Sequence, residues 1–229
     1  MPGIVAHMVV AKLVGERLKI NCDEFIEGNI LPDILPESTT ITHHKTKGKL
    51  YLIPDISYWR EILDLTDNKQ LGYYTHLLLD RHFLEEYVPN KVKNKNAFID
   101  NSMYRDYDIL NHRLVKRFDL DTEKIKQILS QKKDNVNRKK LDYNISCLSM
   151  REEGETENLD EKDFSEFLFD ISQTISEEIE EYASKHSKLS ICPRQREKRK
   201  YKKKWHKKNK SSSNKRWTST RNSIWRTRI

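Results

Sequence analysis

The segment LGYYTHLLLDRHF (residues 71–83) carries a histidine and an aspartate four residues apart. On a helix, His76 and Asp80 would share one face, so an imidazole nitrogen and a carboxylate oxygen can converge on one point. A helix offers two ligands to a metal ion in this way. The alternative is a hydrogen-bonded pair inside a helical core, because polar pairs at this spacing are common. The segment is otherwise apolar enough to be buried, so either interpretation requires polar partners for the pair.

Further nitrogen and oxygen donors occur earlier in the chain. His7 lies on the apolar face of a predicted N-terminal helix. It is either a metal ligand or a buried histidine of the core with polar partners. Asp33 follows a proline, a position that also suits a helix N-cap. His43 and His44 lie in a polar stretch where exposed histidines are common. Imidazole and carboxylate ligands together suit zinc, iron or manganese.

The order of these motifs resembles the zinc-dependent phospholipase C family, the phospholipase C/D domain. The motifs are an early His7, GNILPD (residues 28–33), the Thr42-His43 step and GYYTHLLLD (residues 72–80). The segment MYRDYDILNHRL (residues 103–114) is similar to small bacterial members, and the resemblance covers roughly residues 1–120. The resemblance implies a metal cluster that cleaves phosphodiesters. Its implied ligands here are His7, Asp33, His43, His76 and Asp80.

We therefore expect a hydrolase that cleaves a phosphate ester through a metal-bound water, with zinc as the first choice of ion and manganese or iron as alternatives. Arg81, beside the ligand pair, is a candidate phosphate contact, as are Lys45 and Lys47. Asp106 and Asp108 are further catalytic candidates, because their helix has a polar and aromatic face that suits a pocket wall. Ordinary surface charge is the alternative for the three basic residues.

The pattern of apolar residues predicts an all-α fold in a single multi-helix domain, with the metal site between helices. We expect helices over residues 4–18, 68–87 and 99–118, the second ending at Val88-Pro89. Gly28 and Pro32 predict a bend, followed by irregular chain as far as residue 48. The predicted domain spans residues 1–150, followed by an acidic linker (151–163) and an amphipathic helix (164–190) that packs on the body.

Charge divides the chain of 229 residues, which carries a net charge of +8. Residues 193–229 contain 16 Lys/Arg and one acid, a net charge of +15, so residues 1–192 carry −7. This tail is predicted to be disordered, and its interleaved tryptophans and cations predict contact with nucleic acid or an anionic membrane. The alternative function is therefore a non-catalytic helical protein that binds through its tail. For the tail itself, the alternative is an incidental extension without a function. Three scattered cysteines and the lack of a signal or membrane-spanning segment predict a cytoplasmic protein.

Overall fold

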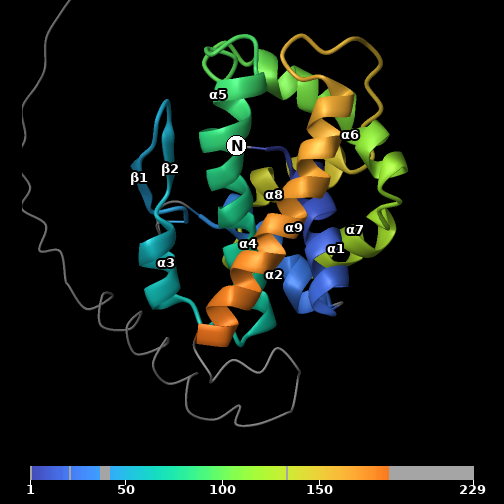
Figure 1. Ribbon diagram of the computed structural model, residues 1–229. Helices are drawn as coiled ribbons and strands as arrows, with labels where there is room; N and C mark the ends of the chain where they lie inside the picture. The colour runs from blue at the N-terminus through green and yellow to red at the C-terminus, as the bar shows by residue number, and fades with distance from the viewer. Residues whose placement is uncertain (1, 21, 37–41, 133, 186–229) are drawn as a thin grey trace, which may run out of the picture. The chain divides into compact units, whose positions relative to one another are not determined.

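The computed structural model describes residues 2–20, 22–36, 42–132 and 134–185, which form a helical body (Figure 1). The elements in chain order are α1 (Ile4–Leu18), α2 (Asp23–Ile34), β1 (Lys45–Lys47), β2 (Leu52–Pro54), α3 (Ile56–Ile62), α4 (Asn68–His82), the π-helical turn η1 (Phe83–Tyr87), α5 (Val88–Lys91), α6 (Ser102–Arg117), α7 (Thr122–Ser130), α8 (Arg138–Cys147) and α9 (Glu161–Lys185). The predicted all-α class is confirmed, with one small antiparallel hairpin, β1–β2, added to it. The predicted tail, residues 193–229, lies outside the described residues.

Helices α2 and α4 pack closely because a glycine lies on each at their contact. A Cβ atom on Gly28 would come within 1.9 Å of the carbonyl oxygen of Lys69, and one on Gly72 within 2.1 Å of that of Phe25. The predicted bend at Gly28 and Pro32 is therefore wrong, since α2 runs through both residues. Gly28 allows the close helix–helix approach, and Pro32 lies in the last turn of α2, where it lacks the N–H that would bond the carbonyl of residue 28. Asp33 is thus a helix residue.

Helix α1 forms the centre of the core. It has the bounds that the sequence predicts, and its valine side chains at positions 5, 9, 10 and 14 are fully buried. Helix α9 packs along α1 and begins three residues earlier than predicted. Its buried side chains, including Leu168 and Ile175, follow the three-and-four spacing of an amphipathic helix.

The sequence predicts that the helix carrying His76 ends at Val88-Pro89. In the structure the chain remains helical beyond this point. The chain passes through η1 directly into α5, with Val88 in the right-handed helical conformation. Pro89 lies in the first turn of α5, where the missing N–H costs little because first-turn N–H groups have no partner in their own helix. The wider π turn before it separates the proline ring from the regular hydrogen-bond pattern of α4.

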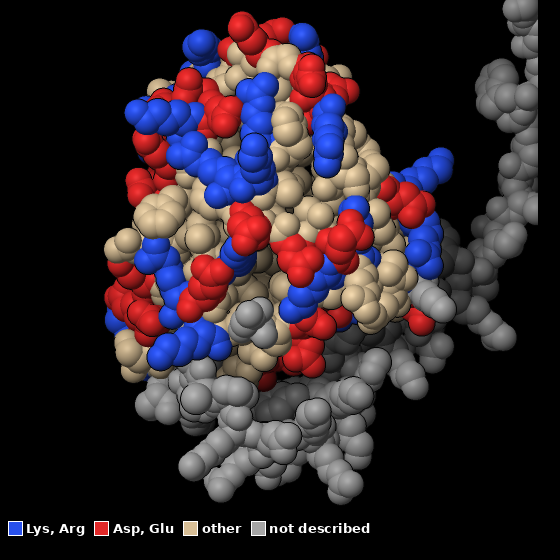
Figure 2. Space-filling model, turned by 90° about the vertical axis from the view of Figure 1, so that its right-hand side faces the viewer, with Lys and Arg blue, Asp and Glu red and all other residues tan. Residues whose placement is uncertain are grey.

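Charges of both signs mix on the surface seen in Figure 2, where lysine and arginine side chains lie among aspartates and glutamates. Within the described residues, no helix has the length and apolar character needed to cross a bilayer.

Candidate metal centre

The structure brings together the five residues that the sequence proposes as metal ligands. They come from four segments of the chain: His7 on α1, Asp33 on α2, His43 in the loop before β1, and His76 and Asp80 on α4. His7, His76 and Asp80 are almost completely buried, whereas the Asp33 side chain is 21% exposed. The site therefore opens toward solvent on the side of Asp33.

Four of these side chains place donor atoms at the spacing of a zinc site. The Nε2 atoms of His43 and His76 lie 3.3 Å apart. The Oδ2 atom of Asp80 lies 3.4 Å from the first and 3.3 Å from the second, and Oδ1 of Asp33 lies 3.8 Å from each. Around a tetrahedral zinc with ligands at about 2.0–2.2 Å, neighbouring donor atoms are about 3.3–3.6 Å apart. The donor set fits a divalent cation in both atom type and spacing.

Asp80 also faces the imidazole of His7, through its Oδ1 atom. Its Oδ1 atom lies 3.5 Å from Nε2 of His7. Among the described residues, neither nitrogen of His7 and neither oxygen of Asp80 has a hydrogen bond of acceptable geometry. Buried polar atoms are normally satisfied, and orphaned ones mark a place for an ion or a ligand. The two oxygens of Asp80 thus face different imidazoles, and both would be available to a divalent cation.

Hydrogen bonds at Nδ1 orient the two central imidazoles. Nδ1 of His76 donates to the carbonyl oxygen of Asn29 at 2.7 Å, so that Nε2 points toward the site. Nδ1 of His43 lies 2.9 Å from Oγ1 of Thr42. The His43 loop is fixed by Trp59, whose indole N–H donates to the carbonyl oxygen of His43 at 3.0 Å. Both rings are therefore held with Nε2 facing the cluster, and that nitrogen must be unprotonated to bind a metal ion.

The charged groups shift one another's protonation. Burial lowers the pKa of His7, and the neighbouring His76 lowers it further. Burial opposes charge on His76, but Asp33 and Asp80 together raise its pKa above the usual value. Burial likewise opposes charge on Asp80, yet the three histidines, His76 first, hold the pKa of this carboxyl well below its usual range. Asp80 is thus an anion beside a neutral His7, the protonation states that metal ligands require.

A family model described as zinc dependent phospholipase C matches residues 1–189. The chain belongs to the zinc-dependent phospholipase C family. The match includes all five proposed ligands and extends through α9, well beyond the roughly 120 residues whose motifs suggested the family. No curated protein and no solved structure matches the chain. Family membership supports zinc as the cofactor and a phosphoesterase-type hydrolase as the class of protein, and the donor geometry agrees with both.

The other catalytic candidates have partners away from the ligand cluster. Arg81 forms an ion pair of 2.8 Å with Glu178 on α9. Asp106 is fully buried, and its two carboxylate oxygens accept hydrogen bonds of 2.7–2.9 Å from the backbone N–H groups of residues 157–159. Asp108 is partly buried on α6, where burial, followed by repulsion from Glu152, raises its pKa. These contacts give Arg81 and Asp106 structural roles, and a catalytic role for the three residues stays a prediction.

His82 and Tyr107 are not among the site residues that the sequence proposes, and the structure shows what surrounds each of them. His82 precedes Glu86 by four residues, the spacing of His76 and Asp80, but its ring binds Glu86 at 2.6 Å and Glu178 at 2.8 Å outside the cluster. The buried hydroxyl of Tyr107 has no partner among the described residues. Burial raises the pKa of Tyr107 well above its usual value, and Asp80 contributes to the shift, so the phenol lies within electrostatic range of the cluster. Only the polar spacing on α6 hinted at this position.

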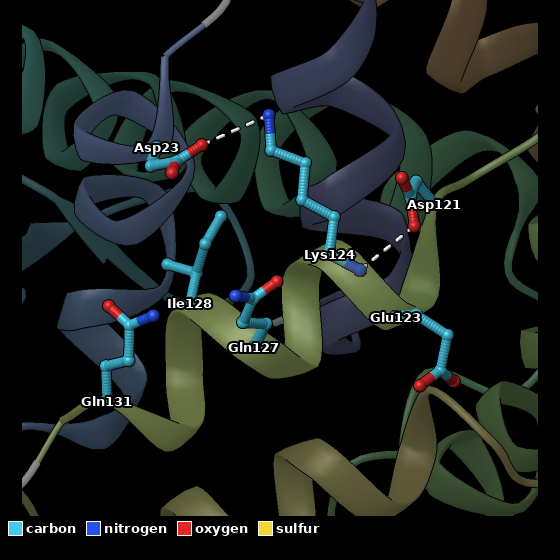
Figure 3. Close-up of a pocket in the computed structure, with 7 residues that line it drawn as sticks. All are labelled: Asp23, Asp121, Glu123, Lys124, Gln127, Ile128 and Gln131. Carbon is cyan, nitrogen blue, oxygen red and sulfur yellow. Dashed lines mark hydrogen bonds and ion pairs between the residues drawn. The ribbon is translucent and has the colours of Figure 1, made fainter.

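A hollow on the surface lies elsewhere. It is lined by α7, the preceding Asp121 and Asp23 of α2, and an ion pair of 3.1 Å joins Lys124 to Asp23 across it (Figure 3). None of the five proposed ligands lines this hollow. Its side chains are mostly polar and paired, so it adds nothing to the metal centre.

Proposed function

We propose that this protein hydrolyses the phosphodiester bond of a phospholipid, as a phospholipase C. The observation that carries the proposal is the convergence of donor atoms from His43, His76, Asp33 and Asp80 at distances of 3.3–3.8 Å, in a family that depends on zinc. In this reaction a water oxygen bonds to phosphorus, the bond from phosphorus to the glycerol oxygen breaks, and that oxygen takes up a proton. The products are diacylglycerol and a phosphorylated headgroup.

When bound, zinc supplies Lewis-acid stabilisation of the phosphoryl oxygens and makes water nucleophilic near neutral pH. The protein's own side chains supply the position and the protonation state. Asn29 holds the proton of His76 on Nδ1, so that Nε2 is free to bind. Asp80 offers Oδ2 to the His43–His76 pair and Oδ1 to His7, an arrangement that would hold two ions. Burial of these groups excludes bulk water, which strengthens every charge interaction within the site.

The substrate is expected to reach the site from the side of Asp33 and His43. The side chains of Asp33 and His43 are 21% and 9% exposed, whereas those of His7, His76 and Asp80 are at most 1% exposed. A phosphate group approaching from solvent would therefore meet Asp33 and His43 first. The chain that leaves His43 continues directly into the β1–β2 hairpin.

The test combines metal content with turnover on a soluble substrate. Full-length protein purified without chelator should contain stoichiometric zinc by elemental analysis. It should release phosphocholine from a short-chain phosphatidylcholine below its micelle concentration, and chelation should abolish the release until zinc is restored. Protein that is full of zinc and turns over no phosphodiester would contradict the proposal.

The basic tail supports a second function, binding of nucleic acid or of an anionic surface, which stays a prediction because residues 193–229 lie outside the described chain. A cytoplasmic location likewise stays a prediction. Tail removal separates the two functions, because all the proposed metal ligands lie before residue 81. Zinc content should survive removal of the tail, and nucleic-acid affinity should not.

A further inference from the structure

The β1–β2 hairpin ends in a lysine and a leucine that point away from the core. Strand pairing aligns Lys47 with Leu52, and the N–H of Gly48 donates to the carbonyl oxygen of Tyr51 at 3.0 Å. Lys49 and Leu50 are therefore the two central residues of the turn. A Cβ atom on Gly48 would come within 2.7 Å of the Tyr51 oxygen, so the tight turn depends on glycine there. The hairpin lies at the left edge of the body in Figure 1.

Exposed apolar side chains gather at this end of the molecule. Leu50 is 52% exposed and Leu52 is 60% exposed. Tyr51 joins the hairpin to the loop of residues 92–101, because its hydroxyl donates to the carbonyl oxygen of Lys95 and its ring packs edge-on against Phe98. That loop presents Ile99, which at 78% is the most exposed large apolar side chain among the described residues. The other exposed large apolar side chains lie singly on α3, α6, α8 and α9.

The same hairpin carries three exposed lysines. Lys45, Lys47 and Lys49 are all exposed, and none of them forms an ion pair with any residue that the structure describes. Directly paired residues of an antiparallel hairpin project from the same face, so Lys47 and Leu52 lie side by side. The first acid after the hairpin, Asp55, is held by His44 at 3.9 Å. The hairpin thus carries a local positive charge on a body whose first 192 residues have a net charge of −7.

We infer that this hairpin, with the adjoining loop of residues 92–101, binds the surface of an anionic lipid bilayer. Lysines at the surface gain from anionic headgroups, and the leucines gain by entering the acyl region. A nucleic acid would attract the lysines but offers no apolar phase for Leu50, Leu52 and Ile99. The acidic remainder of the body is repelled by the same membrane, which orients the hairpin toward it.

This inference rests on the proposed function and gives it a geometry. The hairpin begins two residues after His43, which lies on the open side of the metal centre. A membrane that binds the hairpin would therefore lie next to the opening through which a lipid phosphate would enter. The inferred role of Lys47, Lys49 and the two leucines is to bind the interface, and none of these side chains is needed to hold zinc.

The test uses the full-length protein and vesicles containing equal amounts of phosphatidylcholine and phosphatidylglycerol, with co-sedimentation as the readout. The basic tail is present in every variant, so its contribution cancels. In high salt, which screens the tail, Leu50→Ser/Leu52→Ser should lower vesicle binding by about tenfold. The matched control Phe169→Ser, an exposed apolar residue on α9, should not lower vesicle binding.

The lysines are tested in low salt. There Lys47→Glu/Lys49→Glu should lower vesicle binding by about tenfold or more, whereas Arg138→Glu/Lys139→Glu, the same charge change on α8, should have much less effect.

Thermal unfolding by circular dichroism should be unchanged in all the variants, because every substituted side chain is exposed. Equal vesicle binding by the leucine variant and its control would overturn the inference. So would a hairpin whose lysines affect binding to RNA while its leucines affect nothing. Hydrolysis of the soluble short-chain lipid should be the same in hairpin variants and wild type. If the wild type binds vesicles through the leucines but hydrolyses nothing, the proposed function fails and the membrane-binding hairpin stands.

Discussion

The imidazole rings of His7 and His76 stack face to face, with centroids 3.7 Å apart and an interplanar angle of 7°. The pKa values of the two rings are shifted in opposite directions. Burial and the neighbouring ring lower the pKa of His7, whereas the carboxylates of Asp33 and Asp80 overcome burial to raise that of His76. The two pKa shifts place the extra proton of the metal-free pair on His76 and leave His7 neutral.

This arrangement predicts that zinc binding releases a proton. A metal ion binds only neutral imidazole, so it must displace the proton on Nε2 of His76. Since the folded pKa of His76 is raised, the displacement becomes more costly as the pH falls below that value, and apparent zinc affinity should drop. Calorimetric titration of the metal-free protein in buffers of different ionisation enthalpy measures the protons released. A proton count near zero at pH 6 would contradict the assigned state.

Replacing the proposed ligand His43 should lower the zinc content of the protein, whereas replacing the adjacent His44 should not. His43 and His44 make a matched pair, because only His43 faces the cluster, whereas the ring of His44 stacks on Tyr58 with centroids 3.7 Å apart. His44 has a positive φ of 27°, so asparagine is the suitable replacement at both positions. His43→Asn should weaken zinc binding at least about tenfold, and His44→Asn should leave it near the wild-type value. Asp80→Asn and His76→Ala should resemble His43→Asn. Equal metal content in both asparagine variants would show that the cluster does not bind metal.

Sequence alone predicts which side chains lie together better than it predicts the segments that carry them. The proximity of His76 and Asp80 is predicted because spacing along one helix is local. Gly28 and Pro32 are misread as a bend because the reason for the glycine is the carbonyl of Lys69, some forty positions away. The hairpin escapes prediction because its strands have three residues each, too few for an alternating pattern.

Contacts between distant parts of the chain also explain why the sequence suggests a catalytic role for Asp106. Its partners are backbone N–H groups of residues 157–159, which no sequence spacing connects to it. A carboxylate beside a tyrosine on a polar helix face therefore resembles a catalytic group, although its hydrogen bonds fasten the segment before α9 to α6.

The glycines of the α2–α4 contact should be sensitive to a single methyl group. Gly28→Ala and Gly72→Ala would each force the helices apart, because the added Cβ meets backbone oxygen at 1.9 or 2.1 Å. We expect each to lose about 2–5 kcal/mol in the free energy of unfolding, and to lose zinc because Asp33 moves away from His76. Gly3→Ala is the control, since its Cβ would meet Tyr107 at 3.4 Å, close to ordinary contact. Urea unfolding measures the difference. A Gly28→Ala variant as stable as Gly3→Ala would mean that the helices do not pack as described.

Glu178 forms ion pairs with Arg60, Arg81 and His82. We expect this group to make the stability of the protein sensitive to acid. Burial opposes the charge on Glu178, but the hydrogen bond from His82 and the charges of Arg81 and Arg60 lower its pKa. A carboxyl with a lowered folded pKa stabilises the protein above its unfolded pKa, and this stability is lost as pH falls through the folded pKa. Glu178→Gln should therefore cost about 1.5–3 kcal/mol near pH 7, and the gap to wild type should narrow below about pH 4. Glu180→Gln, an exposed charge change on the same helix, is the control and should alter the free energy of urea unfolding little.

Asp106 offers the clearest separation of a structural role from a catalytic one. Replacing Asp106 with alanine removes the acceptor of three backbone N–H groups, at residues 157, 158 and 159, for which the described part of the chain offers no other acceptor. We expect a loss of about 3–5 kcal/mol in the free energy of unfolding and faster proteolysis within residues 151–160 under native conditions. Asp106→Asn, which keeps one acceptor oxygen, should fall between wild type and alanine in both measurements. Zinc content per folded molecule should stay at the wild-type value in each variant, because the carboxylate contacts none of the five ligands. If Asp106→Asn instead kept wild-type stability and protease resistance while turnover on the soluble lipid fell a hundredfold, the carboxylate would be a catalytic group and its contacts with the 157–159 backbone would be incidental.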